Sequence, residues 1–224
     1  MQERAIPQAS VAGLSSLETS KVLRNTYMLL GMTLAFSAVC AGVAAAMGVG
    51  MINPIIFFVA VFGLSFLVSA TANSAWGLLS VFVFTGFIGF FTGPIISMVV
   101  GGVAHGAQSV MMALGTTAIA FVGLSGYVLV TKKDFSFLMG FIQIGIWAMI
   151  GAIVLGWIFD LGAFHLAISS GVVILMGSLI LWQTSAIVNG GETNYILATT
   201  TLYMAIYNMF MSLLHLFLAF GGDD

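Results

Sequence analysis

The sequence predicts an all-α membrane protein, a bundle of seven transmembrane helices with a cytoplasmic N-terminus. Three observations lead to this prediction. Charged residues make up only 5% of the 224 residues and hydrophobic residues 61%, whereas a soluble domain carries roughly 25% charged residues. The apolar residues fall into seven runs near the ~20 residues that a membrane-spanning helix needs. All lysines and arginines fall on one side of a seven-span topology.

The chain begins with a polar N-terminal tail, residues 1–26, which carries five of the charged residues. Ser15 and Glu18 have the spacing of a helix capping box, which predicts a short helix leading into the membrane from about residue 16. We expect residues 1–14 to lack regular structure.

The transmembrane domain, residues 27–219, consists of apolar runs separated by residues that end or start helices. Asn53-Pro54 places a cap before a proline at the first helical position, and glycines, charges or both interrupt the later runs near 101–106, 131–134, 160–162 and 189–192. The break at 71–77 contains no charge. A short C-terminal tail, residues 220–224, follows. The predicted helices are 27–48, 54–71, 77–100, 108–130, 138–159, 164–188 and 195–219.

The orientation follows from the basic residues, because lysine and arginine gather in cytoplasmic loops. With seven spans and the N-terminus inside, Arg4, Lys21 and Arg24 are cytoplasmic, and so are Lys132 and Lys133. The C-terminus then lies on the outer side of the membrane. Without the 71–77 break, Lys132 and Lys133 would lie outside, so the charge rule supports that break.

The predicted membrane interior contains no charged residue, because every Asp, Glu, Lys and Arg lies in a tail or loop. Ionisable residues within a membrane usually mark ion pathways and proton relays, so their absence argues against a proton pump or a carboxylate-lined cation pore. The sequence also lacks an H-E-x-x-H zinc motif, paired membrane aspartates and a nucleotide-binding loop. We expect no enzyme activity, no catalytic residue, no cofactor and no metal site. No basic patch indicates nucleic-acid binding.

One polar face is predicted on the last helix. Its residues recur at spacings of four and three, which places them on one side of a helix: Thr201, Ala205, Asn208, Ser212 and His215. Two interpretations stand, hydrogen bonding between helices, which we favour, and a water-lined cavity. Gln143, Gln183 and Thr184 are the candidate partners. His105 and His165 are expected at the outer interface.

Small residues recur at four-residue spacing in Gly89/Gly93, Ala38/Gly42 and Gly42/Ala46. Such pairs allow helix backbones to approach closely. We expect them to pack helices within the bundle rather than to form a dimer face.

Several segments, in order along the chain, resemble the Bax inhibitor-1 (TMBIM/UPF0005) family. They are residues 89–96 (GFFTGPII), 117–121 (TAIAF), 180–185 (ILWQTS) and 202–210 (LYMAIYNMF). Residues 21–31 (KVLRNTYMLLG) look like the bacterial YccA branch of that family. The resemblance implies a bundle in which the seventh helix lies near the centre.

Many members of that family resemble pH-sensitive calcium leaks that use one aspartate on each of helices six and seven. The matching positions here hold Gln183 and Ala205, and no arginine follows Arg24. Two carboxylates that share a proton form a titratable pair, and neither glutamine nor alanine can titrate. An ion leak for calcium or protons is therefore the alternative function, and these substitutions disfavour it.

The YccA branch resembles a partner of the membrane protease FtsH. The resemblance implies a non-enzymatic regulator in the bacterial inner membrane that contacts lipids and the FtsH complex and takes part in membrane-protein quality control. A loose cytoplasmic tail would give the protease an unstructured chain end to engage, that is, a handle from which to start degradation. Glu192 and the charges at 132–134 would either meet a partner or act only as topology signals, and we favour the second interpretation.

Overall fold

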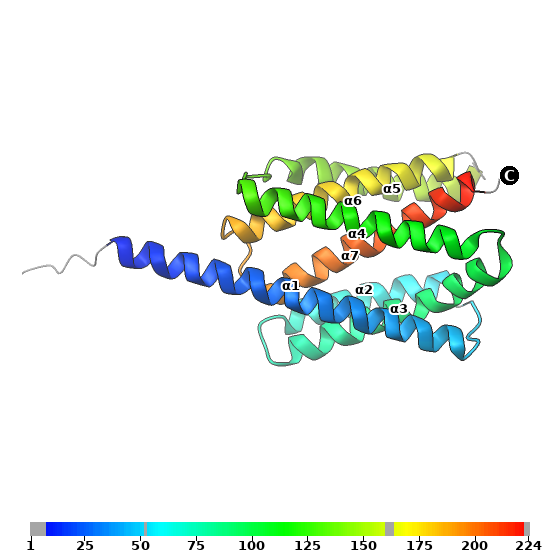
Figure 1. The fold of residues 1–224 in the computed structure, drawn as a ribbon, viewed down its shortest axis with the longest axis horizontal. Coiled ribbons are helices and arrows are strands. Elements are labelled where there is room, and N and C mark those ends of the chain that lie inside the picture. The colour runs from blue at the N-terminus through cyan, green and yellow to red at the C-terminus, as the bar shows by residue number, and fades with distance from the viewer. Residues whose placement is uncertain (1–7, 52, 160–163, 222–224) are drawn as a thin grey trace, which may run out of the picture.

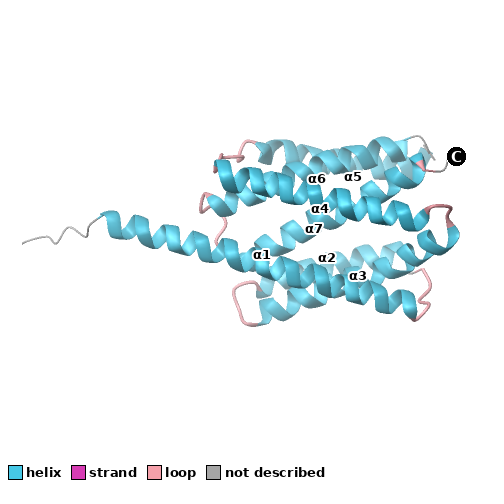
Figure 2. Ribbon diagram, in the orientation of Figure 1, coloured by secondary structure: helices cyan, strands magenta, loops and turns pink. Residues whose placement is uncertain are grey.

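The computed structural model describes residues 8–51, 53–159 and 164–221, and these residues form seven α-helices and no strand (Figures 1 and 2). The helices are α1 (Gln8–Ala46), α2 (Pro54–Thr71), α3 (Trp76–Gly102), α4 (Gly106–Thr131), α5 (Leu138–Phe159), α6 (Phe164–Val188) and α7 (Tyr195–Phe220). Six of them are long and apolar enough to cross a membrane. Within α5, Leu138–Ala152 is a shorter apolar stretch. The predicted all-helical membrane fold is confirmed.

The uncharged break between the second and third predicted helices is a tight turn. Gly77 is buried, and a Cβ there would lie 2.7 Å from the carbonyl oxygen of Thr71. The Thr71 hydroxyl lies 2.8 Å from the hydroxyl of Ser80 across the turn. A glycine is therefore required where α3 turns back against the end of α2.

The N-terminal segment differs from the prediction, because α1 begins at Gln8 and residues 8–14 are helical. Helix growth adds one hydrogen bond per residue without a new nucleus, so a helix anchored in the bundle continues into the polar sequence. Ser15 and Glu18 consequently lie inside the helix instead of capping its start. Residues 1–7 lie outside the described part of the chain.

Helix α7 occupies the centre of the bundle, as the resemblance implied. It contacts α1, α2, α3, α4 and α6. Figure 1 shows α1, α2 and α3 on one side of it and α4, α5 and α6 on the other. Leu202, Ala205 and Leu214 are fully buried on this helix, so the core of the bundle forms around α7.

Helices α1 and α3 approach each other most closely at two glycines. A Cβ at Gly89 would overlap the carbonyl oxygen of Ser37, and one at Gly93 would overlap that of Ala41. The prediction of close packing within the bundle is confirmed for this pair. It is wrong for Gly42, which is exposed and has no neighbour within 4 Å, because α1 turns its other face toward α3.

The charged side chains gather at one end of the bundle. The α2–α3, α4–α5 and α6–α7 turns lie at the end from which α1 projects (Figure 1). The described charged residues are all at this end, at positions 18, 21, 24, 132, 133, 134 and 192. We refer to it below as the charged end.

Candidate functional site

A buried hydroxyl cluster joins three helices at α7. Tyr203 is 1% exposed, and its hydroxyl donates to the carbonyl oxygen of Thr85 on α3 at 3.2 Å. The Ser37 hydroxyl on α1 lies 2.6 Å from the same Tyr203 oxygen. One phenol therefore connects α1, α3 and α7 through polar contacts in an otherwise apolar core.

Tyr207, one turn further along α7, continues this cluster. Its ring is nearly parallel to that of Tyr203, with an interplanar angle of 2° and centroids 6.5 Å apart. The Thr92 hydroxyl on α3 lies 3.4 Å from the Tyr207 oxygen. The α3–α7 contact thus carries two tyrosine hydroxyls on successive helical turns.

A second polar cluster lies nearer the charged end, where α1, α4, α6 and α7 meet. The Thr184 hydroxyl is 3.3 Å from that of Tyr27 and 3.4 Å from that of Ser125. The Thr199 hydroxyl lies 3.3 Å from the carbonyl oxygen of Thr26. Neutral hydroxyls again connect the helices, and no charge is involved.

Gln183 lies beside Thr184 in sequence and is 1% exposed, and Ala205 is fully buried. Among the described residues, Gln183 Nε2 and the Thr26 hydroxyl oxygen are buried without a hydrogen-bond partner. None of the buried side chains described is an aspartate or glutamate, and the described residues contain no group of three potential metal ligands. The interior around these two positions is polar but uncharged.

The predicted polar face on α7 is divided between interior and surface. Ser212 is buried with Ala205, Thr201 and Asn208 are half-buried, and His215 is exposed. The Asn208 amide donates to the carbonyl oxygen of Met204 in its own helix at 2.8 Å. Of the three proposed partners, Gln183 and Thr184 are buried and Gln143 is exposed.

The polar face predicted on the last helix did not include Tyr203 and Tyr207. A signal was present, since Tyr195, Thr199, Tyr203 and Tyr207 recur every four residues. This row also lies on one face of a helix. At 3.6 residues per turn it is roughly opposite the predicted face, so α7 carries polar groups on two sides.

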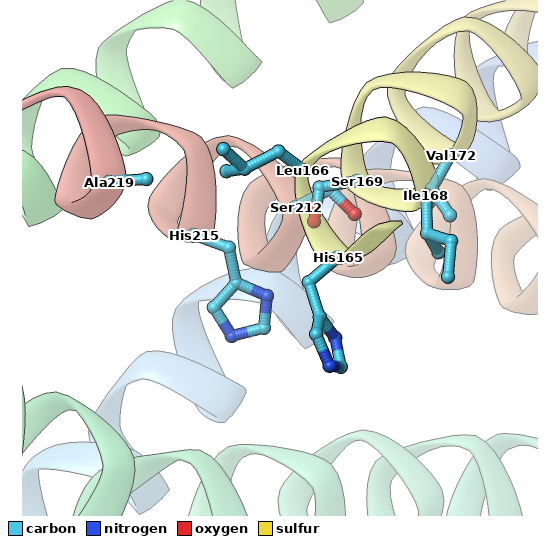
Figure 3. Close-up of a pocket in the computed structure, with 8 residues that line it drawn as sticks. All are labelled: His165, Leu166, Ile168, Ser169, Val172, Ser212, His215 and Ala219. Carbon is cyan, nitrogen blue, oxygen red and sulfur yellow. The ribbon is translucent and has the colours of Figure 1, made fainter. Parts of the chain in front are cut away.

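At the other end of the bundle, α6 and α7 form an open groove of about 550 Å³. His165 and Ser169 of α6 line it together with Ser212 and His215 of α7. Figure 3 shows both imidazoles on the same open side of the helix pair. Both histidines are exposed, as a position near the interface requires.

Hydrogen bonds fix the turns at the charged end. The Asn194 side chain accepts from the Ile196 amide at 2.9 Å and donates to the carbonyl oxygen of Ala72 at 3.1 Å. The Ser185 hydroxyl accepts from the Phe135 amide at 2.9 Å and donates to the carbonyl oxygen of Lys133 at 3.1 Å. These bonds connect the α6–α7 turn to the α2–α3 turn, and α6 to the α4–α5 turn.

Two carboxylates at this end bond within their own turns. Asp134 accepts from the Ser136 amide at 2.8 Å, and Glu192 accepts from the Asn194 amide at 2.8 Å. Each therefore has a local role in shaping its turn. The Lys133 ammonium donates to the Tyr127 hydroxyl at 3.1 Å, while Lys132 is exposed in a left-handed conformation with φ 52°.

Comparison with known proteins identifies the family of this chain. Residues 19–222 match the family described as "Inhibitor of apoptosis-promoting Bax1". The chain is 46% identical over 224 residues to an uncharacterized protein of Pseudomonas aeruginosa, covering 100% of both chains. It is 44% identical over 210 residues to the Escherichia coli K12 protein named "Modulator of FtsH protease YccA", covering 94% of each. The Escherichia coli O6:H1 protein named "Inner membrane protein YccA" matches with the same identity and coverage. The chain belongs to the Bax inhibitor-1 family and resembles its YccA-type bacterial branch.

Proposed function

We propose that this protein is a non-enzymatic modulator of the FtsH protease in the bacterial inner membrane. The observation that carries the proposal is the 44% identity, over 94% of both chains, to a protein named as a modulator of that protease. An identity this high over nearly the full length preserves the arrangement of helices and turns that a partner would contact.

The charged end is the surface we assign to the partner. Following the positive-inside rule, we assign this end to the cytoplasm, because it carries the described lysines and arginines. On that assignment the N-terminus is cytoplasmic and the C-terminus periplasmic. The hydrogen bonds of Asn194 and Ser185 hold three turns in one arrangement, which favours recognition because little order is lost on binding.

The projecting part of α1 adds a second feature to this surface. The first buried side chain described on α1 is Thr26, and the helix starts at Gln8, which is roughly 27 Å earlier at 1.5 Å per residue. Figure 1 shows the first part of this segment extending beyond the other helices, while Val22 and Leu23 near its end already pack against the core. A protease that pulls on this end of the chain would meet the projecting part of α1 before it reaches the packed bundle.

The uncharged interior supports a role in protein contacts. Gln183 and Ala205, the positions that we predict to match the aspartate pair of calcium-leak members of the family, are both buried. The polar groups described around them are hydroxyls and an amide, which do not change charge at cellular pH. We therefore assign the regulatory role to the surface at the charged end.

We expect the tagged protein, expressed at native level and purified in mild detergent, to retain FtsH. The measurement is quantitative mass spectrometry of the eluate. An unrelated multi-pass protein with the same tag and abundance is the control, because hydrophobic carry-over enriches both equally. Enrichment no greater than in that control would contradict the proposal.

Removing residues 2–14 is expected to lengthen the cellular half-life of the protein several-fold, because the protease loses the end that it engages. The half-life is measured after translation is stopped, with and without FtsH. Replacing residues 2–14 with an unrelated polar sequence of equal length is the control, and it should restore turnover if any unfolded end suffices. An unchanged half-life on deletion would show that the segment is not the handle.

A further inference from the structure

The groove between α6 and α7 brings together two of the three histidines of the chain. His165 is the second residue of α6, and His215 lies near the end of α7. They come from antiparallel neighbours fifty residues apart in sequence and line the same groove. In Figure 3 both imidazoles point away from the helix pair on the same side, into the groove that they line.

The lining of the groove combines polar and apolar side chains in distinct places. Ser169 and Ser212, each one helical turn from a histidine, are both buried and line the same groove with their hydroxyl-bearing side chains. The remaining wall consists of Leu166, Ile168, Val172 and Ala219. A ligand that enters this groove therefore meets two exposed ring nitrogen donors next to a polar floor.

We propose that His165 and His215 form a two-histidine site for a borderline divalent transition-metal ion, with Cu²⁺ or Zn²⁺ as the fitting class. Imidazole is the commonest protein ligand for metals, and it suits zinc, copper and nickel. Calcium and magnesium prefer oxygen ligands, so this pair does not suit them. The site lies at the end opposite the charged end and is independent of the proposed contact with FtsH.

The number of ligands indicates an exchangeable site. A structural zinc site uses four protein ligands, and the described residues offer no third His, Cys, Asp or Glu in a group with these two. Water would complete the coordination in the open groove. A bound ion would join the start of α6 to the end of α7 and so restrict the separation of these helices.

Copper binding to the purified full-length protein in detergent tests the proposal. Pulsed electron paramagnetic resonance counts the imidazoles on Cu²⁺, and titration gives the stoichiometry and affinity. We expect one Cu²⁺ per chain with two coordinated imidazoles. His165→Ala and His215→Ala should each leave one imidazole and weaken binding by roughly 10- to 100-fold, a loss that even outer-shell changes at metal sites can cause.

His105 provides the matched control, because it is the third histidine and is also exposed. It has a left-handed conformation with φ 57°, so His105→Asn is the suitable change, since asparagine tolerates that region. This variant should bind Cu²⁺ like the unmodified protein. As a second readout, Zn²⁺ should raise the melting temperature of the unmodified protein and of His105→Asn, but of neither groove variant.

Three results would contradict the proposed two-histidine metal site. They are a single imidazole on Cu²⁺ in the unmodified protein, undiminished affinity in both groove variants, and an equal loss of affinity in His105→Asn. Because both groove histidines are exposed, their replacement should leave the melting temperature without metal unchanged. A fall in that temperature would identify a purely structural role and would also contradict the proposal.

Discussion

Replacing Gly89 with alanine is expected to destabilise the bundle by about 3 kcal/mol, the upper end of the usual cost of overpacking a core. The added methyl group would overlap the carbonyl oxygen of Ser37 on α1. This obstacle is main chain, so it cannot turn aside as a flexible side chain does. Helix α1 must move away from α3, and the Ser37–Tyr203 contact of 2.6 Å is then lost as well.

The measurement is the midpoint temperature of thermal unfolding in detergent. Unfolding is monitored as the loss of the monodisperse protein after heating. Gly42→Ala on α1 and Gly115→Ala on α4 are the matched controls, because no atom lies within 4 Å of a Cβ at either position. Alanine is the better helix former by about 1 kcal/mol in aqueous peptides, so the controls should be unchanged or slightly more stable. If Gly89→Ala behaves like them, α1 and α3 are not in the contact described.

Replacing Tyr203 with phenylalanine is expected to cost about 1–2 kcal/mol, near the upper range for interhelical hydrogen bonds in membranes. The change keeps the ring, which packs edge-on to Phe84 with centroids 6.2 Å apart. It removes the hydroxyl that contacts Ser37 and Thr85. The remaining Ser37 hydroxyl loses its partner in the core, which adds a desolvation cost.

A double-mutant cycle with Ser37→Ala measures this contact. If the two hydroxyls stabilise each other, the double variant loses less stability than the sum of the single variants. Tyr195→Phe on the same helix is the control, because none of the described residues hydrogen-bonds to its hydroxyl. Equal losses for Tyr195→Phe and Tyr203→Phe would contradict the assigned role of Tyr203.

The helices could be predicted because their signals are local. A run of apolar residues bounded by Asn53-Pro54 or by the glycines near 190 determines where a helix starts and stops. The charge distribution also predicted the turn at 71–77, which has no local charge. The start of α1 could not be predicted in this way, because outside the membrane its extension depends on propagation from the bundle and not on a start signal.

The interior of the site could be predicted only in part. Periodicity showed that Thr201 and Ser212 share a face of the last helix, but it does not fix which neighbour that face meets. Because α7 is surrounded, its opposite face also meets neighbouring helices, and that face carries the buried Tyr203 and the half-buried Tyr207. The partners of these tyrosines, Ser37 and Thr92, lie more than a hundred residues away, so no local pattern could identify them.

The central position of α7 has a consequence for biogenesis. The helix that contacts five of the other six is synthesised after all six of them. Until residues 195–220 leave the ribosome and enter the membrane, α1 and α3 lack the Tyr203 hydroxyl that Ser37 and Thr85 contact. The two groups of helices on either side of α7 then lack the element that lies between them. The first six helices therefore stay incompletely packed during synthesis until α7 joins them.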